Sequence, residues 1–396
     1  MVKGIKLAIV TTHPIQYNAP VFQRLSKRGN ISIRVFYTWG EQVMKSKFDP
    51  GFGKIVSWDI PLLEGYGFEF VLNKAKHPGS NHFFGIINPN LIRQIENWEA
   101  NAVLVYGWNF EGHLKTLRYF KNKIPVIFRG DSTLLMEPQG WSLKKMIRRQ
   151  ILKWVYRKVD YALYVGIDNR AYFERHGLTS SQLIHAPHTI DVQRFMDQSE
   201  QSDKITRDWK SRFSIEDHEL VFLFAGKLDE NKNVRLLIEA FCQQAFENAH
   251  LVIVGNGISE KSLKIEFEGN KRIHFMDFQN QSMMPSVYRL ASVFVLPSLS
   301  ETWGLSANEA MACGCIIIMS DKCGGAKDLI ISGKNGYVFK SNNSKDLGEK
   351  MNLVIENNSV SGMKDFSKNY ILNFSIENVC VTVERLALSF NNQSEQ

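Results

Sequence analysis

The sequence lacks any apolar run long enough to cross a membrane. Near the N-terminus only residues 7–10 are continuously apolar, which is too short for the apolar segment of a signal peptide. A membrane-spanning helix needs about 18 such residues, and no window of the sequence approaches that length. We therefore expect a cytoplasmic protein.

Cysteine is scarce as well, and metal-binding patterns are missing. The five cysteines all fall in the second half of the 396 residues: Cys242, Cys313, Cys315, Cys323 and Cys380. An odd number in a long chain is typical of free thiols in a reducing compartment. No second pair or histidine cluster accompanies Cys313 and Cys315, and no two aspartates are separated by one residue. Neither a zinc site nor a D-x-D metal motif is expected.

Acidic residues are under-represented in the first half. Residues 1–200 carry 27 Lys and Arg against 16 Asp and Glu, whereas residues 201–396 carry 21 against 24. The net charge is therefore +11 in the first half and −3 in the second, which gives +8 overall. This asymmetry indicates that the first half meets an anionic partner. No motif that reads nucleic acid accompanies the charge, so we do not expect nucleic acid to be that partner.

The sequence is rich in short, apolar, β-branched runs with helical stretches between them. Five runs lie in each half, at residues 5–12, 31–39, 102–108, 125–130, 161–166, 220–227, 250–257, 273–278, 292–298 and 315–321. Near-continuous apolar strands that alternate with helices are typical of parallel sheets covered on both faces. Two such series predict an α/β protein with two doubly wound, Rossmann-like domains.

The polar segment at residues 196–220 separates the two series, and we place the boundary near residue 200. The predicted domains are residues 1–200 and 201–375, followed at 376–396 by a helix that returns to the first domain and by a frayed tail. Ligands of open α/β sheets bind beyond the carboxyl ends of the strands, and a cleft between two domains is the default site. Functional residues are therefore expected in the loops that follow the strands.

Two of these loops combine glycine with polar side chains. Gly226 and Lys227 close one strand and Lys232 follows five residues later, so that two ammonium groups can meet a phosphate. Gly255 and Asn256 follow the next strand, where glycine lets the backbone approach a ligand closely. A solvated loop and an ordinary turn are the alternative interpretations of these patterns.

A third loop, SETWGLSANEAMACG at residues 300–314, carries two glutamates eight residues apart. Ser306 and Glu309 fit a capping box at the start of a helix, but that pattern leaves Glu301 unexplained. Ionised carboxylates only accept hydrogen bonds and so suit the paired hydroxyls of a sugar or ribose, while a helix N-terminus suits an anion. The two carboxylates could therefore hold two diols, such as those of a ribose and a sugar, on either side of a diphosphate.

Four motifs occur in a fixed order at strand ends: G-K-x5-K, VGNG, PSLSE-x7-E-A-M-A-x-G, and a GG pair followed by GKNGYVF. Together they resemble the second domain of family 4 glycosyltransferases of the GT-B fold, over residues 183–378. The resemblance implies retaining transfer of a sugar from a UDP-sugar or GDP-sugar, with no metal and no other cofactor. It also implies a saccharide or lipid-linked acceptor in the synthesis of a cell-surface polysaccharide such as O-antigen, capsule or exopolysaccharide.

The resemblance implies a donor site made of Gly226, Lys227, Lys232, Gly255, Asn256, Phe278, Glu301, Thr302, Trp303, Gly304, Leu305 and Glu309. In it Glu301 would bind hydroxyls of the donor sugar, beside the amides that open the helix. Glu309 would bind the ribose. Lys227 and Lys232 would neutralise the diphosphate, and Phe278 would lie near the base.

The sequence departs from the family pattern at several positions. Lys227 stands where Arg is usual, which keeps the charge but loses the bidentate fork, and Asp277 replaces a frequent Gly. The first domain resembles the family mainly by layout, because it lacks a Gly-Gly loop after its first strand and has Gly130 where a His is usual. His13 and Asp131 are then the polar groups best placed to approach an acceptor hydroxyl, and we group them with Glu301 and the two lysines as catalytic candidates. A purely structural His13 is the alternative.

Two other functions stay open on the sequence. One is a nucleotide-sugar epimerase of the same architecture, which acts on the nucleotide sugar with no second substrate. The other is a non-catalytic, nucleotide-sugar-binding subunit of a larger assembly. Transfer of a sugar to an acceptor distinguishes the transferase from both.

The segment at residues 141–159 contains seven Lys or Arg and no acidic residue. On a helix, one face would carry Leu143, Ile147, Ile151, Trp154 and Val155, and most of the basic residues would lie on the others. This pattern is typical of a helix on an anionic membrane surface, which predicts a peripheral position on the inner face of the cell membrane. A helix packed on the sheet with a solvated outer face is the alternative.

Overall fold

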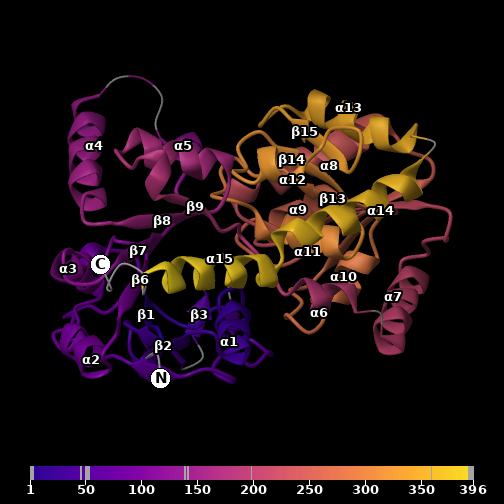
Figure 1. The fold of residues 1–396 in the computed structure, drawn as a ribbon. Helices are drawn as coiled ribbons and strands as arrows, with labels where there is room; N and C mark the ends of the chain where they lie inside the picture. The colour runs from indigo at the N-terminus through magenta and orange to yellow at the C-terminus, as the bar shows by residue number, and fades with distance from the viewer. Residues whose placement is uncertain are drawn as a thin grey trace. The chain divides into compact units, whose positions relative to one another are not determined.

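The computed structural model describes residues 4–44, 47–49, 54–137, 140, 142–197, 199–357 and 359–390. The chain forms two compact units (Figure 1). Unit 1 comprises Met1–Ser46, Pro61–His188 and Ile376–Gln396, and unit 2 comprises Lys47–Ile60 and Thr189–Ser375. The polar segment in which we placed the boundary belongs to unit 2. The predicted frayed end, residues 391–396, lies outside the described residues.

The centre of unit 1 is a parallel sheet of seven strands in the order β5-β2-β1-β6-β7-β8-β9. The strands are β1 (Lys6–Thr11), β2 (Ser32–Tyr37), β5 (Phe68–Phe70), β6 (Ala102–Tyr106), β7 (Val126–Arg129), β8 (Tyr161–Tyr164) and β9 (Leu183–His185). The helices are α1 (Ala19–Arg28), α2 (Leu91–Asn97), α3 (Glu111–Phe120), α4 (Leu143–Tyr156), α5 (Ile167–Arg175) and α15 (Ile376–Ser389). Short 3-10 turns lie at η1 (Glu41–Met44), η2 (Phe83–Gly85), η3 (Leu134–Met136) and η4 (Ser180–Gln182).

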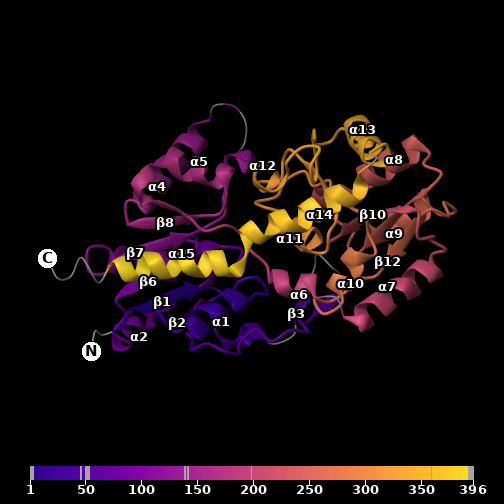
Figure 2. The same ribbon diagram turned by 45° about the vertical axis from the view of Figure 1, so that its right-hand side comes forward.

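The two faces of this sheet build two separate cores, because successive residues of a strand point to opposite faces. Leu7 and Ile9 of β1 pack with residues of α1 and α15. Ala8 and Val10 alternate with these two residues along β1 and pack with residues of α2, α3, α4 and α5. Figures 1 and 2 show α15, in yellow, along one face of the unit 1 sheet, with α4 and α5 on the other.

The last helix is tied to the first by charge as well as by packing. Arg24 Nε donates to Glu377 Oε2 at 2.7 Å, and Arg28 Nε donates to Glu384 Oε2 at 2.8 Å. The Glu384 side chain is only 4% exposed, so its carboxylate depends on this guanidinium for compensation. Helix α15 is therefore part of unit 1, although unit 2 precedes it in the chain.

Unit 2 is built in the same way around a six-stranded parallel sheet in the order β12-β11-β10-β13-β14-β15. The strands are β10 (Leu220–Ala225), β11 (Ala249–Val254), β12 (Ile273–Met276), β13 (Val293–Leu296), β14 (Ile316–Ser320) and β15 (Gly336–Phe339). The helices are α6 (Val192–Met196), α7 (Glu200–Arg212), α8 (Val234–Gln244), α9 (Glu260–Glu266), α10 (Met284–Arg289), α11 (Leu305–Ala312), α12 (Ala326–Leu329), α13 (Ser344–Ile355) and α14 (Val360–Tyr370). A small hairpin of β3 (Lys47–Asp49) and β4 (Lys54–Val56), and the 3-10 turns η5 (Glu230–Lys232) and η6 (Ile371–Phe374), complete it.

The predicted α/β class with two doubly wound domains is confirmed, and each of the ten predicted apolar runs overlaps a strand. The short hairpin strands β3 and β4 were not predicted, and neither were the sheet strands β5, β9 and β15. Strands β5 and β9 have only three residues each, and β15 begins with a glycine, so their apolar pattern does not stand out from the neighbouring loops. Among the described residues, none of the helices combines the length and apolar character needed to span a bilayer.

Candidate functional site

The strand order of unit 2 brings four of the predicted loops to one edge of its sheet. Strand β10 lies between β11 and β13, and β14 pairs with the other side of β13, all in parallel. The carboxyl ends of these strands therefore meet at the same edge, where open α/β sheets bind ligands.

The loop after β10 is a short, self-capped turn that ends at Lys232. The Asp229 carboxylate accepts a hydrogen bond from the Lys232 amide at 3.0 Å and so caps η5. The Asn231 carbonyl accepts from the Leu299 amide at 2.8 Å, and Asn231 Nδ2 donates to the Ser300 carbonyl at 2.9 Å. These bonds join the loop after β10 to the loop after β13 and fix the lysine against the second loop.

Lys232 and Glu301, which are 69 residues apart in the chain, form an ion pair at this junction. The Lys232 side chain is 23% exposed and that of Glu301 is 17% exposed. Ser298 Oγ donates to the same Glu301 oxygen at 2.9 Å. The structure thus places a cation and an acceptor-only carboxylate side by side, both accessible from solvent.

The backbone of Glu301 is held by the loop after β14. The Glu301 amide donates to the Lys322 carbonyl at 3.1 Å, and the Glu301 carbonyl accepts from the Gly324 amide at 3.1 Å. Cys323 is buried beneath this contact, and burial raises the pKa of its thiol to about 12, so the thiol is neutral and unsuited to act as a nucleophile. The loop therefore positions Glu301 through the backbone.

Trp303 and Gly304 make the turn that opens α11. Trp303 is 2% exposed, and its indole Nε1 donates to Asn308 Oδ1 at 2.9 Å. Gly304 has φ 101°, and an added Cβ would lie 2.7 Å from a Leu296 methyl. Only glycine suits this backbone, which leads into the first turn of α11. The leading amides of a helix have no intrahelical acceptor and favour an anion.

The predicted capping box is wrong. Helix α11 begins at Leu305 with Gly304 as its N-cap and has no side-chain cap. Ser306 therefore lies inside the helix, and Glu309 lies beyond the first turn. The Glu309 side chain points into the unit instead: it is 3% exposed, and its Oε2 accepts a hydrogen bond from the Tyr288 hydroxyl of α10 at 2.7 Å.

The loops after β11 and β12 are joined by Asn256. Its Oδ1 accepts from the Phe278 amide at 2.9 Å, and its Nδ2 donates to Asp277 Oδ1 at 3.1 Å. Gly255 has φ 138°, and a Cβ there would lie 1.9 Å from the Gly226 carbonyl oxygen. The two glycine loops therefore press directly against each other, and Asn256 sets the position of half-buried Phe278.

The remaining predicted donor residues lie on the same edge. Lys227 and Thr302 are both half-buried, as is Leu305 at the start of α11. Sequence reasoning missed Ser298 and Tyr288, which hold the two glutamates by hydrogen bonds. Ser298 is the last residue of the predicted run at 292–298 and lies just beyond β13, so it could have been found by the loop rule that found Glu301. Tyr288 carries no such signal.

The catalytic candidates of unit 1 also lie at the carboxyl edge of their sheet. His13 follows β1, its Nδ1 lies 2.8 Å from Thr12 Oγ1, and its ring meets Trp39 edge-on with centroids 5.3 Å apart. Asp131 follows β7, and its Oδ2 lies 3.7 Å from His188 Nε2. Burial lowers the pKa of His188, which the Asp131 carboxylate opposes. Sequence reasoning missed His188 because it follows the unpredicted strand β9.

A buried arginine supports this pair. The Arg129 guanidinium is 7% exposed and donates to the Ala186 and Pro187 carbonyls at 2.8 and 3.0 Å. It thereby links the end of β7 to the segment that carries His188. Among the described residues, no group of three or more His, Cys, Asp or Glu is arranged to hold a metal ion.

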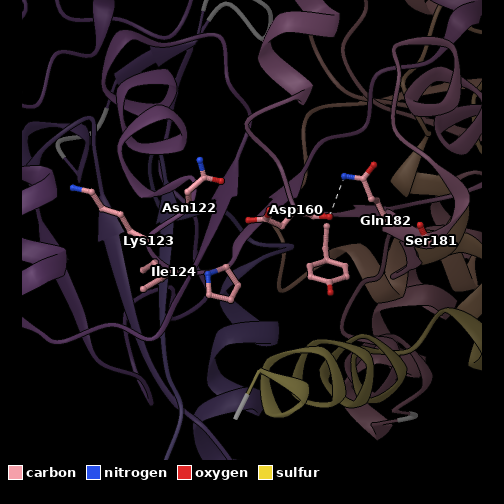
Figure 3. Close-up of a pocket in the computed structure, with 8 residues that line it drawn as sticks. Asn122, Lys123, Ile124, Asp160, Ser181 and Gln182 are labelled. Atoms are coloured by element: carbon pink, nitrogen blue, oxygen red, sulfur yellow. Dashed lines mark hydrogen bonds between the residues drawn. The ribbon is translucent and has the colours of Figure 1, made fainter. Parts of the chain in front are cut away.

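A separate pocket of about 470 Å³ in unit 1 lies away from this edge (Figure 3). It is lined by Asn122, Lys123, Ile124, Pro125, Asp160, Tyr161, Ser181 and Gln182. These residues precede or open β7, β8 and β9, so they lie at the amino ends of the strands. Gln182 Nε2 donates to the Asp160 carbonyl at 3.2 Å, the dashed contact in Figure 3. Parallel sheets bind their ligands at the opposite edge, so this pocket is not the candidate site.

Comparisons with known proteins agree with this geometry. Residues 206–371 match the family "Glycosyl transferases group 1". The N,N'-diacetylbacillosaminyl-diphospho-undecaprenol alpha-1,3-N-acetylgalactosaminyltransferase of Campylobacter jejuni is 25% identical over 217 residues, which are 54% of this chain and 56% of that protein. The chain spans about half the length, or less, of the first curated relatives it matches.

Solved structures match nearly the whole chain. Sucrose-phosphate synthase from Thermosynechococcus elongatus superposes with a TM-score of 0.71 at 15% identity, covering 98% of this chain and 100% of that one. Anabaena HepE in complex with UDP gives a TM-score of 0.69 at 14% identity, with the same coverage. At these identities the likeness concerns the fold, and the predicted GT-B fold is confirmed.

Proposed function

We propose that this chain is a group 1 glycosyl transferase, a family that its residues 206–371 match. The chain is a retaining glycosyltransferase that moves a sugar from a nucleotide-diphosphate-sugar to a saccharide or lipid-linked acceptor. The observation that carries the proposal is the partly exposed Lys232–Glu301 ion pair at the carboxyl edge of the unit 2 sheet. The pair places a cation that can bind a diphosphate, Lys232, directly beside a carboxylate that can bind sugar hydroxyls, Glu301.

Different loops of unit 2 bind different parts of the donor. Lys232 and Lys227 bind the diphosphate, together with the leading amides of α11. Glu301, held in place by Ser298 and by the backbone of residues 322–324, accepts hydrogen bonds from the donor sugar. Phe278, fixed by Asn256, lies beside the base, and the two glycine loops, which press against each other, line the nucleotide. Glu309 binds the ribose from its buried position next to Tyr288.

The reaction needs few protein groups beyond this site. As the bond from the anomeric carbon to the diphosphate breaks, negative charge grows on the leaving phosphate and positive charge on the sugar. The two lysines stabilise the negative charge on the phosphate, and the Glu301 carboxylate stabilises the positive charge on the sugar. The acceptor hydroxyl attacks from the same face, and its proton passes to the departing phosphate. His13 and Asp131, the remaining catalytic candidates, bind the acceptor.

The acceptor is a lipid-linked saccharide, and the product belongs to a cell-surface polysaccharide. The support is the name of the Campylobacter jejuni relative, which specifies a diphospho-undecaprenol acceptor. A structure of WaaG, described as involved in lipopolysaccharide biosynthesis, also superposes on this chain with a TM-score of 0.62. Such an acceptor places the reaction at the cytoplasmic face of an anionic membrane, for which residues 141–159 are the candidate contact.

A thermal-shift screen against UDP, GDP, ADP and CDP, without and then with a divalent metal, tests the donor site. A ligand at 100 times its dissociation constant stabilises the folded protein by about 2.7 kcal/mol, so one nucleotide should raise the melting temperature clearly without metal. We expect the shift with UDP or GDP, in line with a UDP-sugar or GDP-sugar donor. UDP is favoured by structures of the same fold that hold UDP and UDP-glucose. No shift with any nucleotide would overturn the proposal.

A second experiment separates transfer from its alternatives. The nucleotide sugar chosen by the screen is radiolabelled in its sugar and incubated with a bacterial lipid extract. Label that moves to the organic phase supports the transferase. Conversion into a different nucleotide sugar without acceptor would indicate an epimerase, and nucleotide binding without either reaction would indicate a binding subunit.

A further inference from the structure

Helix α4 of unit 1 buries only a narrow face. Leu152, Val155 and Tyr156 are 0 to 3% exposed and belong to the core that covers one side of the sheet. The Tyr156 ring meets the Phe173 ring of α5 edge-on, with centroids 5.5 Å apart. Figures 1 and 2 both show α4 beside α5. The sequence pattern grouped Val155 with the outer apolar residues, whereas the structure turns it into the core.

The opposite face of α4 is apolar and exposed. Leu143, Ile147, Ile151 and Trp154 are 62%, 54%, 48% and 40% exposed. Their spacing of four, four and three residues places them on one stripe of the helix. Met146, 46% exposed, lies beside them. A helix packed on its sheet normally presents a polar outer face. An exposed apolar stripe on that face therefore indicates a surface that binds something outside unit 1.

Basic side chains border the stripe on both sides. Successive helical residues are turned by about 100°, so Lys144 and Arg148, each one residue after a member of the stripe, lie on one flank. Lys153, one residue before Trp154, lies on the other, and Arg157 extends that flank. All four side chains belong to exposed residues. An apolar stripe between two basic flanks is the geometry of a helix that lies in the plane of an anionic membrane.

The acidic residue that precedes the helix in the chain is already paired. The Glu137 carboxylate, 6% exposed, lies 3.7 Å from Lys145 Nζ and 3.6 Å from Arg149 Nη2. These two lysine and arginine groups compensate a buried charge within unit 1, and helix α4 itself contains no acidic residue. The positive charge of the two flanks is thus directed outward.

We propose that α4 is the membrane-binding element of this protein and that its occupant is the surface of a bilayer containing anionic lipid. The side chains of the stripe enter the boundary between headgroups and acyl chains. The lysines and arginines of the two flanks bind lipid phosphates. Trp154 suits this position, because its large ring is apolar and its indole nitrogen donates to the polar layer. The inference deepens the proposed lipid-linked acceptor, but its test measures binding alone.

Vesicle binding tests the proposal. The full chain is sedimented with vesicles of phosphatidylglycerol and phosphatidylcholine, and with vesicles of phosphatidylcholine only. It should bind the anionic vesicles, and added salt should weaken that binding. Lys144→Gln with Arg148→Gln should weaken it about 30-fold, since two basic residues near an anionic surface are removed. Ile147→Asn with Ile151→Asn should weaken it at least 10-fold, because less apolar surface is inserted.

Matched variants in unit 2 control for loss of charge and of exposed apolar surface. Lys204→Gln with Arg207→Gln removes two exposed basic residues from another helix, α7. Ile258→Asn with Ile265→Asn removes two isoleucines that are 85% and 62% exposed. Both control pairs should bind vesicles as the parent does. Equal loss in the controls, or no binding of the parent to anionic vesicles, would overturn the proposal and leave a protein partner as the occupant of the stripe.

Two further readouts keep the inference separate from the proposed function. The α4 variants should show the nucleotide-induced thermal shift of the parent, which confirms that they are folded and that the donor site is intact. Brominated lipid should quench part of the tryptophan fluorescence of the parent, and Trp154→Phe should abolish that quenching. Quenching that persists in Trp154→Phe would show that another surface enters the membrane.

Discussion

Replacing Glu301 by Gln should tighten the binding of a nucleoside diphosphate and at the same time slow sugar transfer. Lys232 is paired with the Glu301 carboxylate, so a diphosphate that takes this lysine must first break the pair. Glutamine has nearly the same shape and can still accept a hydrogen bond from Ser298, but it does not hold Lys232 by charge. The variant therefore offers the lysine to phosphate more readily, while it loses the negative charge proposed to face the sugar.

The exposure of the pair sets the size of both effects. Lys232 and Glu301 are 23% and 17% exposed, and a pair reached by solvent contributes about 0.2 to 1 kcal/mol. In Glu301→Gln the ion pair no longer has to be broken when the nucleotide binds, which should lower the dissociation constant of the nucleotide roughly 1.5- to 5-fold. A hydrogen bond to a charged group contributes about 1.5 to 3 kcal/mol, so its loss should lower kcat/KM about 10- to 150-fold. The opposite signs cannot arise from misfolding.

A substitution of the other member of the pair, Lys232, and a matched control complete the test. Lys232→Met should weaken nucleotide binding about 10- to 150-fold, because a charged contact to phosphate is removed. Lys350→Met removes the same charge from a pair of similar exposure, in which Lys350 Nζ lies 3.2 Å from Asp346 Oδ1, and should change binding less than about 2-fold. Isothermal titration calorimetry measures binding, and release of the diphosphate measures turnover. Weaker nucleotide binding by Glu301→Gln would refute the reasoning.

Three further predictions concern stability, measured by urea unfolding. Gly255→Ala should lower the free energy of unfolding by about 1 to 3 kcal/mol and weaken nucleotide binding, because φ is 138° and the new Cβ would meet the Gly226 carbonyl; nucleotide affinity equal to the parent's would contradict the assigned loop. Tyr288→Phe should cost about 1 to 3 kcal/mol, because it removes a donor from the buried Glu309 carboxylate, and a neutral change would contradict this role. Burial lowers the pKa of His113 to about 4 while the unfolded chain titrates near 6.5, so stability present above pH 6.5 should fall by up to about 3 kcal/mol towards pH 4; His113→Asn should flatten that decline, and an unchanged pH profile would refute it.

The sequence by itself determined the elements and where to look for the site. All ten apolar runs overlap strands, because a strand buried on both faces needs a continuous apolar pattern over only a few residues. The rule that ligands bind at carboxyl ends then pointed to Lys232 and Glu301 without knowledge of the strand order. The basic composition of the α4 segment was equally evident, since charge is a property of the residues alone.

The tertiary structure decided which side chains meet. Lys232 and Glu301 touch because β10 and β13 are neighbours in the sheet, and no local pattern states the order of strands. Glu309 is turned inward to Tyr288 because Gly304, not Ser306, is the N-cap of the helix, a difference of two positions that propensity cannot resolve. Val155 also had two plausible directions along α4. Local patterns act over one or two turns, whereas partners and exposed faces depend on packing between segments far apart in the chain.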